Sequence, residues 1–352
     1  MTPESFRTAD FEYERPTELI AQEPIPDRGG SRLLVLRRAA ESSLGQDRAL
    51  EDAHFGDLLR LIPSGDLLVL NTTRVRHARL LGRRPSGAPA ELLLIHPAGA
   101  DTWLAMGKPG SALRPGKQIA LGPDAAVETL EVLPDGNRIV RFVGISPDEA
   151  MQRYGRLPLP PYINRPATAV DEIRYQTVYA AAEGSVAAPT AGLHFTPDLL
   201  ERLSSAGVLI EGLDLQVGPG TFKPVEVDDP SHHEMHPERY EITPELAHVL
   251  ERVRARGGQV WAVGTTVVRA LESAALPNRV VRPGTAETRL MITPGYSFRV
   301  VDRLVTNFHL PRSTLLMLVC AFAGRQLILD AYRHAVEARY RFYSYGDAMV
   351  II

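Results

Sequence analysis

The second half of the chain alternates between strand-like and helix-like patterns, and this alternation constrains the fold more than any other feature. Short apolar runs at residues 208–217, 259–263 and 303–306 are typical of buried strands, and each leads into a loop rich in glycine, threonine or asparagine. Helix-like segments separate and follow them, at residues 197–206, 244–256, 267–275 and 314–323. Strands that alternate with helices favour a covered sheet. We therefore expect an α/β fold with a mixed sheet and covering helices.

The first part of the chain adds two strands to this expected sheet. Residues 32–36 and 66–70 are apolar runs of strand length, and a short helix-like piece at residues 55–61 lies between them. Residues 20–32 form a loop, because their prolines and paired glycines stop regular structure. We expect both strands to be buried in one sheet.

Between these parts, short apolar segments are separated by turn signals. The segments lie at residues 91–96, 102–106, 118–121, 127–133 and 138–143. The turns recur at intervals of roughly ten residues, which is the spacing of antiparallel strands in a small barrel or sandwich. We expect an inserted small all-β barrel domain at residues 76–154, and a discontinuous α/β domain formed by residues 1–75 and 155–352.

Composition and charge narrow the class of protein. The chain has 352 residues, of which 44% are hydrophobic and 23% are charged, as in ordinary globular proteins. The formal net charge of −3 excludes nucleic-acid binding through bulk positive charge, but it permits a local basic patch. The one cysteine, Cys320, excludes a disulfide framework or a cysteine-based metal site within one chain.

The sequence predicts a cytoplasmic protein without a membrane anchor. Residues 1–14 carry acidic side chains and have no apolar core of the signal-peptide type. The longest apolar run is about half the length that a membrane span requires. A single cysteine fits a reducing compartment.

Four polar loops accompany the predicted strands and helices. They lie at residues 190–196, 218–221, 264–266 and 307–313. The first belongs to a longer loop, residues 184–196, whose small residues let the backbone approach a ligand closely. The carboxyl ends of parallel strands share one edge of a sheet, where helix N-termini present unpaired amides. We expect the loops to form one ligand site, although such turns also occur for purely structural reasons.

Common nucleotide, nucleophile and metal signatures are absent from the sequence. There is no Gly-x-Gly-x-x-Gly after a strand, no Gly-x-x-x-x-Gly-Lys-Ser/Thr loop and no Gly-x-Ser-x-Gly elbow. Residues 231–236 hold three histidines and a glutamate, but their order differs from His-Glu-x-x-His, so we expect no metal site. Acid–base and binding chemistry remain, with His194, His233, His236 and His309 as candidates.

Two further clusters bear on nucleic-acid binding. Within residues 74–84, the candidates for phosphate contacts are Arg74, Arg76, Arg79 and Arg83, and the alternative is a solvated charged face. Aromatic residues gather at residues 340–345, after a helix-like segment at residues 326–339. Aromatic clusters stack on bases in some proteins but more often seal a core, and we expect the core role here.

Several segments resemble one protein family. The matching motifs are residues 19–24 with 31–34, 71–79, 185–196, 218–222, 235–238, 263–266 with 269–272, 306–316 and 345–349. From about residue 11 to the C-terminus they follow the order of the S-adenosylmethionine:tRNA ribosyltransferase-isomerase family of queuosine biosynthesis. The resemblance implies an α/β catalytic domain that carries an inserted β-barrel, in agreement with the pattern above.

The resemblance also implies a reaction. The ribosyl part of S-adenosylmethionine is transferred and isomerised onto 7-aminomethyl-7-deazaguanine at the wobble position of a tRNA, which gives epoxyqueuosine and releases adenine and methionine. S-adenosylmethionine is then a consumed substrate, and no cofactor, metal, membrane or protein partner is implied. The sulfonium acidifies the neighbouring 5′ carbon, so that a base can form an ylide before adenine leaves. Such an enzyme needs a base, an acid for adenine and hydrogen bonds to the ribose hydroxyls.

On this resemblance, particular residues take expected roles. His194 and His309 are the expected catalytic residues, and which of them is the base stays open. The expected substrate-binding residues are Thr190, Gly192, Gly218, Gly220, Thr221, His233, His236, Gly264, Thr265, Thr266, Arg269, Asn307, Arg312 and Ser313. The two arginines among them suit a carboxylate or phosphate. The basic stretch would contact the tRNA.

The chain departs from the family pattern at three positions. Gln216 stands where a histidine is usual before Val-Gly-x-Gly-Thr-Phe, so no acid–base role passes to this position. Thr72 replaces a common aspartate, and Arg289 stands where an aspartate is common before a Pro-Gly-Tyr turn. No carboxylate function is therefore expected at these two positions.

Two other classes of function remain open from the residues alone. A non-catalytic RNA-binding module needs the basic patch but not four converging polar loops. A methyltransferase that uses S-adenosylmethionine normally has a glycine-rich loop after its first strand, and none is present here.

Overall fold

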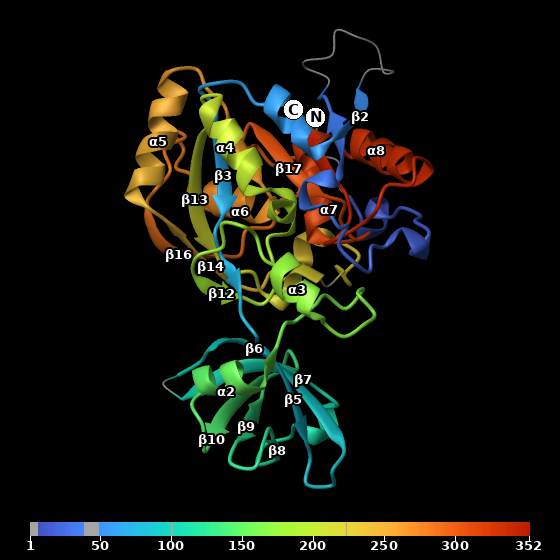
Figure 1. Cartoon of the computed structure of the whole chain (residues 1–352), viewed down its shortest axis with the longest axis vertical. Helices are drawn as coiled ribbons and strands as arrows, with labels where there is room; N and C mark the ends of the chain where they lie inside the picture. Colours follow the sequence, from blue (N-terminus) through green and yellow to red (C-terminus); the bar gives the residue numbers. More distant parts are fainter. Residues whose placement is uncertain (1–5, 39–48, 100, 223) are drawn as a thin grey trace.

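A nine-stranded mixed sheet organises the larger part of the molecule (Figure 1). The structure, a computed structural model, describes residues 6–38, 49–99, 101–222 and 224–352. In the order across the sheet, the strands are β16 (Gly284–Thr288), β14 (Glu238–Ile242), β13 (Leu209–Leu215), β3 (Leu67–Asn71), β15 (Val260–Val263), β17 (Arg303–Asn307), β18 (Ala348–Ile351), β1 (Arg32–Leu36) and β2 (Leu50–His54). Strands β13, β3, β15 and β17 are parallel neighbours, whereas β18 runs antiparallel to β17. Both N-terminal strands predicted from the sequence belong to this one sheet.

Alternate residues of the central strands face opposite sides of the sheet, and both sides are covered. On β3, Leu67 and Val69 contact one core, whereas Leu68 and Leu70 contact the other. The covering helices are α1 (Leu58–Leu61), α4 (Pro197–Ser205), α5 (Pro244–Ala255), α6 (Thr265–Ala274), α7 (Thr314–Ala323) and α8 (Arg325–Glu337). Helices α5 to α8 pack on the first side, and α1 and α4 pack on the second. The predicted α/β class is confirmed.

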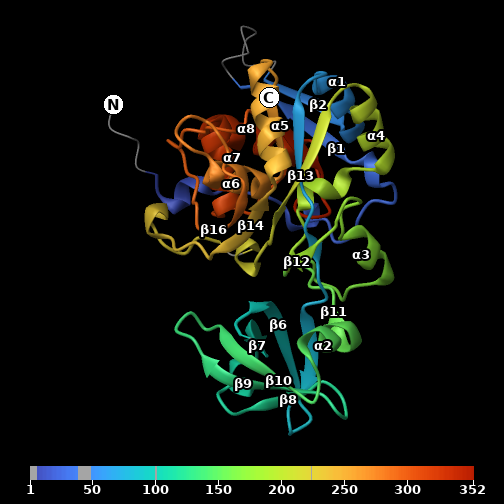
Figure 2. The same cartoon turned by 90° about the vertical axis from the view of Figure 1, so that its left-hand side faces the viewer.

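A second sheet of seven strands lies below the large one in Figures 1 and 2. Its strands, in order, are β11 (Gly155–Arg156), β5 (Arg79–Arg83), β6 (Pro89–Pro97), β7 (Thr102–Lys108), β10 (Arg138–Val143), β9 (Ala126–Val132) and β8 (Gln118–Ala120). Strand β8 also pairs with β5, where Arg83 lies opposite Ala120. The sheet has its own core, which includes Leu92, Trp103 and Val140. All five segments predicted as strands in this region are strands.

Two segments connect the sheets, and they lie side by side. On the outward segment, β4 (Arg74–Val75) pairs in parallel with β12 (Glu183–Ser185) of the return segment. Helix α2 (Pro147–Tyr154) precedes the return, and α3 (Ala169–Arg174) lies on it. The fully buried side chain of Asp171 in α3 accepts hydrogen bonds from Arg165 at 2.6 and 2.8 Å and from Tyr345 at 2.7 Å. These bonds hold the return segment against the C-terminal part of the chain.

Some elements differ from the sequence predictions. Strand β18 was not predicted, and it lies between β17 and β1 in the middle of the sheet. The predicted loop at residues 184–196 contains part of β12 and the 3-10 helix η7 (Thr190–His194). The aromatic residues Tyr340 and Phe342 are fully buried, so the expected core role is confirmed for them.

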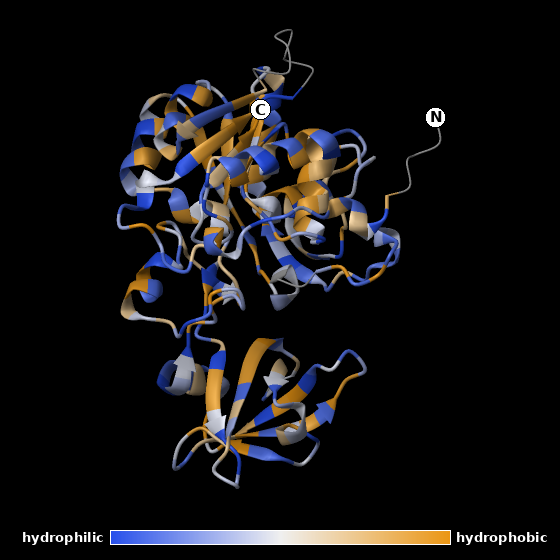
Figure 3. Cartoon of the chain, turned by 90° about the vertical axis from the view of Figure 1, so that its right-hand side faces the viewer, coloured by the Kyte–Doolittle hydropathy of each residue, from blue (hydrophilic) through white to orange (hydrophobic). Residues whose placement is uncertain are grey.

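Apolar residues concentrate on the strands and on the helix α7 (Figure 3). Within the ranges given above, no single helix is both long and apolar enough to cross a membrane. Helices α7 and α8 pass that test of length and composition only as a pair, and they meet at a bend of 113°. In α7, Leu316, Leu318 and Val319 are at most 1% exposed, because they pack in the core.

Candidate functional site

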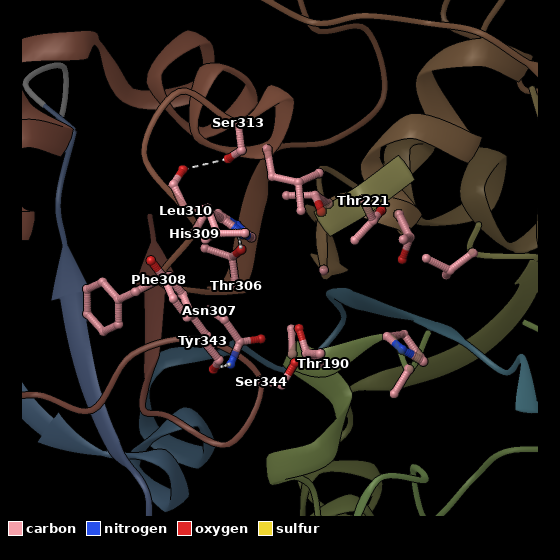
Figure 4. A pocket seen from close by; sticks show the side chains of 18 of the residues that line it. Thr190, Thr221, Thr306, Asn307, Phe308, His309, Leu310, Ser313, Tyr343 and Ser344 are labelled. Atoms are coloured by element: carbon pink, nitrogen blue, oxygen red, sulfur yellow. Dashed lines mark hydrogen bonds between the residues drawn. The ribbon is translucent and has the colours of Figure 1, made fainter. Parts of the chain in front are cut away.

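A pocket lies at the carboxyl ends of β15 and β17, where six segments of the chain meet (Figure 4). Its empty volume, counted together with the open solvent at its mouth, is about 620 Å³. Its walls are formed by Tyr162, Ala188, Pro189, Thr190, Ala191, Val217, Thr221, Gly264, Thr265, Thr266, Thr306, Asn307, Phe308, His309, Leu310, Ser313, Leu315, Tyr343 and Ser344. Each of the four polar loops predicted from the sequence supplies at least one wall residue.

The pocket brings together some of the predicted site residues and leaves others outside. The predicted residues in its walls are Thr190, Thr221, Gly264, Thr265, Thr266, Asn307, His309 and Ser313. The predicted residues outside its walls are Gly192, His194, Gly218, Gly220, His233, His236, Arg269 and Arg312. The pocket therefore centres on the β15–α6 turn and the β17–α7 loop.

The walls combine apolar surface with several polar groups and carry no permanent charge. Their polar groups are hydroxyls, one carboxamide and one imidazole, and no Lys, Arg, Asp or Glu is among the wall residues. A charged ligand group placed here would lose its hydration without gaining an oppositely charged partner. The composition suits a neutral part of a ligand that carries hydroxyl or amino groups.

Local geometry determines how the two central loops reach the pocket. Gly264 has a φ of 93°, a conformation that residues with a side chain rarely adopt, so glycine lets β15 turn directly into α6. Ser313 caps α7: its Oγ accepts a hydrogen bond from Leu316 N at 3.2 Å and donates one to Leu310 O at 2.7 Å. The first turns of both helices therefore border the pocket.

His194 lies next to the pocket, in contact with the wall residue Asn307. Asn307 Nδ2 donates a hydrogen bond to His194 Nε2 at 3.0 Å, and His194 Nδ1 lies 2.8 Å from Ser31 Oγ. Because Nε2 accepts, the ring proton lies on Nδ1 and is donated to Ser31. Burial and nearby positive charges, chiefly that of Arg28, lower the pKa of His194 to about 3. The ring is therefore neutral at pH 7.

His309 is a wall residue and is also neutral. Its Nε2 lies 2.8 Å from the hydroxyl of Thr306, and its backbone N–H donates to the hydroxyl of Tyr332 at 2.8 Å. Burial lowers the pKa of His309 to about 3. Of the two histidines expected to be catalytic, His309 is the one in the pocket wall.

Arg269 is paired with a carboxylate rather than exposed to the pocket. The side chains of Arg269 and Glu238 are 5% and 7% exposed, and Arg269 Nη1 donates to Glu238. Arg269 Nε donates to Leu290 O at 3.1 Å, and Gly218 N donates to Glu238 Oε1 at 3.2 Å. The buried pair thus connects α6 to the loop that follows β13, and a direct anion contact by Arg269 stays a prediction.

Gly192 and Arg312 lie outside the pocket for different reasons. A Cβ atom on Gly192 would come within 2.0 Å of the hydroxyl of Tyr179, so glycine makes room for this aromatic ring. Arg312 has a φ of 54°, and its Nε donates to the carboxylate of Glu12. The Arg312 side chain is 52% exposed, and its contact with Glu12 ties the β17–α7 loop to the N-terminal segment.

The remaining predicted residues lie on the segment that follows β13. Gly220 belongs to the 3-10 helix η8 (Pro219–Phe222), and a Cβ atom there would lie 3.0 Å from the ring of His236. Burial and then the neighbouring His236 lower the pKa of His233. In the part of the chain that the structure describes, no group of three or more His, Cys, Asp or Glu side chains could hold a metal ion.

Comparison with known proteins places this architecture in a family. The model of the family described as Queuosine biosynthesis protein matches residues 8–351. The chain belongs to this family. The S-adenosylmethionine:tRNA ribosyltransferase-isomerase of Cupriavidus metallidurans is 50% identical over 346 residues, which cover 97% of each chain. The protein of the same name from Symbiobacterium thermophilum is 49% identical over 350 residues, covering 98% of this chain and 100% of that one.

A solved structure agrees with this placement. The S-adenosylmethionine tRNA ribosyltransferase from Thermotoga maritima aligns with a TM-score of 0.55 at 37% sequence identity. The alignment covers 97% of this chain and 100% of that chain. The resemblance recognised from the motifs is thereby confirmed.

In this family member, two of the arginines predicted to contact tRNA link separate elements of the protein. Arg79 contacts both carboxylate oxygens of Glu91, at 2.9 and 2.8 Å. Arg74 Nη2 donates to the backbone oxygen of Ala180 at 2.7 Å, across the joint between the two connecting segments. Arg79 thus links β5 to β6, and Arg74 links the two connecting segments. A contact of either side chain with tRNA stays a prediction.

The other two arginines differ in exposure. Arg76 is partly buried, and its guanidinium lies 5.3 Å from the centre of the Trp103 ring. Burial lowers the pKa of Arg76. Arg83 is exposed at the end of β5 and donates to Gly87 O at 3.0 Å. Of the four, Arg83 is the most accessible to a bound nucleic acid.

Sequence reasoning missed several wall residues. Tyr343 and Ser344 come from the C-terminal aromatic segment, and Tyr162 comes from the proline-rich return, where its hydroxyl lies 2.7 Å from Ser344 Oγ. Tyr343 has a φ of 71°, which is uncommon for a bulky residue. A signal was present, because the family motif at residues 345–349 begins directly after Ser344.

Proposed function

We propose that the chain is an S-adenosylmethionine:tRNA ribosyltransferase-isomerase. It transfers and isomerises the ribosyl moiety of S-adenosylmethionine onto 7-aminomethyl-7-deazaguanine at the wobble position of a tRNA, giving epoxyqueuosine-tRNA and releasing adenine and methionine. The observation that carries this proposal is the 50% identity with a protein of that name over 97% of both chains. S-adenosylmethionine is consumed as a substrate, and no further cofactor is required by this scheme.

The pocket is the proposed binding site for the nucleoside part of S-adenosylmethionine. Its hydroxyl-rich, uncharged walls suit ribose hydroxyls and a purine ring, for example at Thr190, Thr265 and Thr266. His309 is the proposed residue for proton transfer, because its ring is a neutral wall group. A neutral imidazole can accept a proton, which suits removal of the proton from the 5′ carbon.

The proposed reaction order follows from the chemistry of the sulfonium. A base removes a proton from the 5′ carbon, the ribose ring opens, and adenine leaves. The amine of the deazaguanine attacks the resulting fragment, and closure of the epoxide expels methionine. The protein has to exclude water during these steps, and the buried walls of the pocket support this role.

The tRNA is proposed to lie across the joint between the two sheets. Residues 76–154 would then act as an inserted β-barrel domain beside the α/β catalytic domain of residues 1–75 and 155–352. The separate core of the seven-stranded sheet and the β5–β8 pairing support this division. The tRNA substrate also fits a cytoplasmic location.

One assay tests the proposed function. The protein is incubated with S-adenosylmethionine and with tRNA that bears 7-aminomethyl-7-deazaguanine, and the small-molecule products are separated by chromatography. Equal amounts of adenine and methionine are expected, with none when the wobble base is guanine. Release of S-adenosylhomocysteine would instead indicate a methyltransferase, and the absence of any product would indicate a binding protein.

A further inference from the structure

One acceptor atom in the pocket wall has no partner in the protein. Asn307 is 2% exposed, and its Oδ1 atom is buried without a hydrogen-bond donor. Leaving a buried carbonyl oxygen unpaired costs about 1–3 kcal/mol, so such an atom calls for an explanation. Because Asn307 is a wall residue, a bound ligand can supply the missing donor.

The surroundings of Asn307 determine which end of its carboxamide faces the pocket. The backbone oxygens of Tyr343 and Asp347 lie 3.4 and 3.5 Å from Asn307 Nδ2. If the carboxamide were rotated by half a turn, its oxygen would face the backbone oxygens of Tyr343 and Asp347, which are fixed acceptors and would repel it. The nitrogen therefore stays on that side, and the oxygen is directed away from it, on the side of Thr190 in Figure 4.

His194 adds a third restraint on the same nitrogen. Its Nε2 accepts from Asn307 Nδ2 at 3.0 Å, while its Nδ1–H is donated to Ser31 Oγ at 2.8 Å. Both ring nitrogens are thus occupied by protein contacts. A protonated ring would place an N–H group against Nδ2 and would remove this restraint.

The composition of the pocket narrows the ligand group that can reach Asn307. Among the wall residues there is no carboxylate to balance the ammonium group of a methionine moiety. A neutral O–H or N–H donor pairs with a carboxamide oxygen without this penalty. In S-adenosylmethionine such donors are the two ribose hydroxyls and the amino group of adenine.

From these contacts we infer that Asn307 Oδ1 accepts a hydrogen bond from the nucleoside part of S-adenosylmethionine, and that His194 is a positioning residue that holds the carboxamide for this contact. The inference rests on the proposed function, and it deepens that function by assigning a recognition contact. His194 then acts on the substrate through Asn307 and not as the base.

Equilibrium binding of three analogues tests the contact. Each analogue lacks one donor: the 2′-hydroxyl, the 3′-hydroxyl or the purine amino group. One analogue is expected to bind the wild-type protein about ten-fold more weakly than S-adenosylmethionine, because a buried acceptor is left unpaired. The identity of that analogue tells whether ribose or adenine supplies the donor. If all three bind within about two-fold of S-adenosylmethionine, the inference is overturned without any variant.

Variants of Asn307 then test whether this residue causes the weaker binding of that analogue. The analogue that binds the wild-type protein more weakly is called the sensitive analogue below. In Asn307→Ala and in Asn307→Leu, which keeps a similar volume, this analogue and S-adenosylmethionine should bind equally well. Because poor folding lowers the active fraction for every ligand alike, the ratio of the two affinities does not depend on it. A ratio that stays near ten-fold in both variants would assign the contact to another residue.

Variants of His194 test the positioning role. His194→Leu removes the acceptor for Asn307 Nδ2, and the discrimination against the sensitive analogue should fall to about three-fold or less. His194→Gln can place an oxygen near the position of Nε2 and should retain the discrimination. Equal discrimination in wild type and His194→Leu would refute the role of His194. Release of adenine and methionine by the wild-type protein is followed in parallel, so that failure of this contact is separable from failure of the proposed function.

Discussion

At the scale of single residues, the buried pair of Arg269 and Glu238 offers a strong test of packing around the site. Glu238→Gln leaves the guanidinium of Arg269 buried without its counter-charge, and the free energy of unfolding should fall by about 3–5 kcal/mol. Urea denaturation measures this loss. In the control Asp198→Asn, the pair with Arg202 is largely exposed, so the change should stay within about 0.5 kcal/mol. Similar losses in both variants would contradict the account of the buried pair.

The carboxylate of Asp171 makes stability depend on pH. Burial opposes its ionisation, but hydrogen bonds from Arg165, Thr168 and Tyr345 outweigh this effect and hold the pKa of Asp171 well below its usual value. The ionised form therefore stabilises the fold above the unfolded pKa of about 3.9, and this contribution is lost as the pH falls through the folded pKa. Asp171→Asn should be less stable than wild type at pH 7, and the difference should narrow below about pH 4.

Unfolding in urea between pH 3 and pH 7, followed by circular dichroism, measures this difference for Asp171→Asn. Asp198→Asn serves again as the control, because that side chain is 76% exposed. A stability difference that is the same at every pH would show that lost packing, and not the carboxylate charge, explains the effect of the Asp171 variant.

His309 is the residue at which proton transfer is proposed. His309→Ala should lower kcat for adenine release by about 10²–10⁴-fold, the usual range for a general acid or base. The measurement uses saturating substrates, so that weaker binding does not enter the result. Thermal unfolding of the variant controls for misfolding. Full turnover by a folded His309→Ala protein would remove this residue from the mechanism.

The sequence revealed the central wall residues of the site but not their partners. Asn307 and His309 stood out because a strand pattern breaks there into polar residues. Glu238 did not, because pairing with Arg269 joins positions that are far apart in the chain. Tyr343 and Ser344 follow an aromatic run whose pattern predicts only burial, and both are indeed buried while also lining the pocket.

At the scale of elements, two helix caps have comparable contacts but different surroundings. Thr196 Oγ1 accepts from Leu199 N at 3.1 Å at the start of α4, and Ser313 does the same for α7. Thr196→Ala and Ser313→Ala should each lower the free energy of unfolding by about 1 kcal/mol. Because Ser313 is also a pocket wall residue, only Ser313→Ala should weaken binding of S-adenosylmethionine. Thermal unfolding and calorimetric titration separate the two effects, and equal affinities in both variants would argue against a ligand contact by Ser313.

The elements that the sequence predicted are those with strong local patterns. The apolar runs of β3, β15 and β17 appear within a few residues of their predicted bounds. Strand β14 was missed because three of its five residues, Glu238, Arg239 and Glu241, are charged, so the segment resembles an exposed loop. Strand β16 was missed because four of its five residues are exposed. Both segments have little strand propensity of their own, and pairing with neighbouring strands of the sheet stabilises them as strands.

At the scale of the whole molecule, the position of the proposed tRNA surface depends on arginines near the joint of the two sheets. Replacing Arg74 and Arg83 by alanine should weaken tRNA binding, and the slope of log K against log salt should become shallower by about one for each phosphate that the protein no longer neutralises. Filter binding at several salt concentrations measures the slope. Arg202→Ala on α4 is the matched control, since its side chain is 59% exposed and lies away from the joint. Unchanged affinity at every salt concentration would place the tRNA elsewhere.

The place of β18 in the sheet has a consequence for how the protein is made. Leu33 of β1 pairs with Ala348 of β18, and Asn307 of β17 pairs with the same residue from the other side. At ordinary rates of translation, β18 leaves the ribosome on the order of tens of seconds after β1. Until then, the facing edges of β1 and β17 carry unpaired backbone groups that invite wrong partners. During this interval, chaperones can cover the exposed edges of β1 and β17. A nascent chain that stalls before residue 348 keeps these edges exposed, so that proteases can recognise it as incompletely folded.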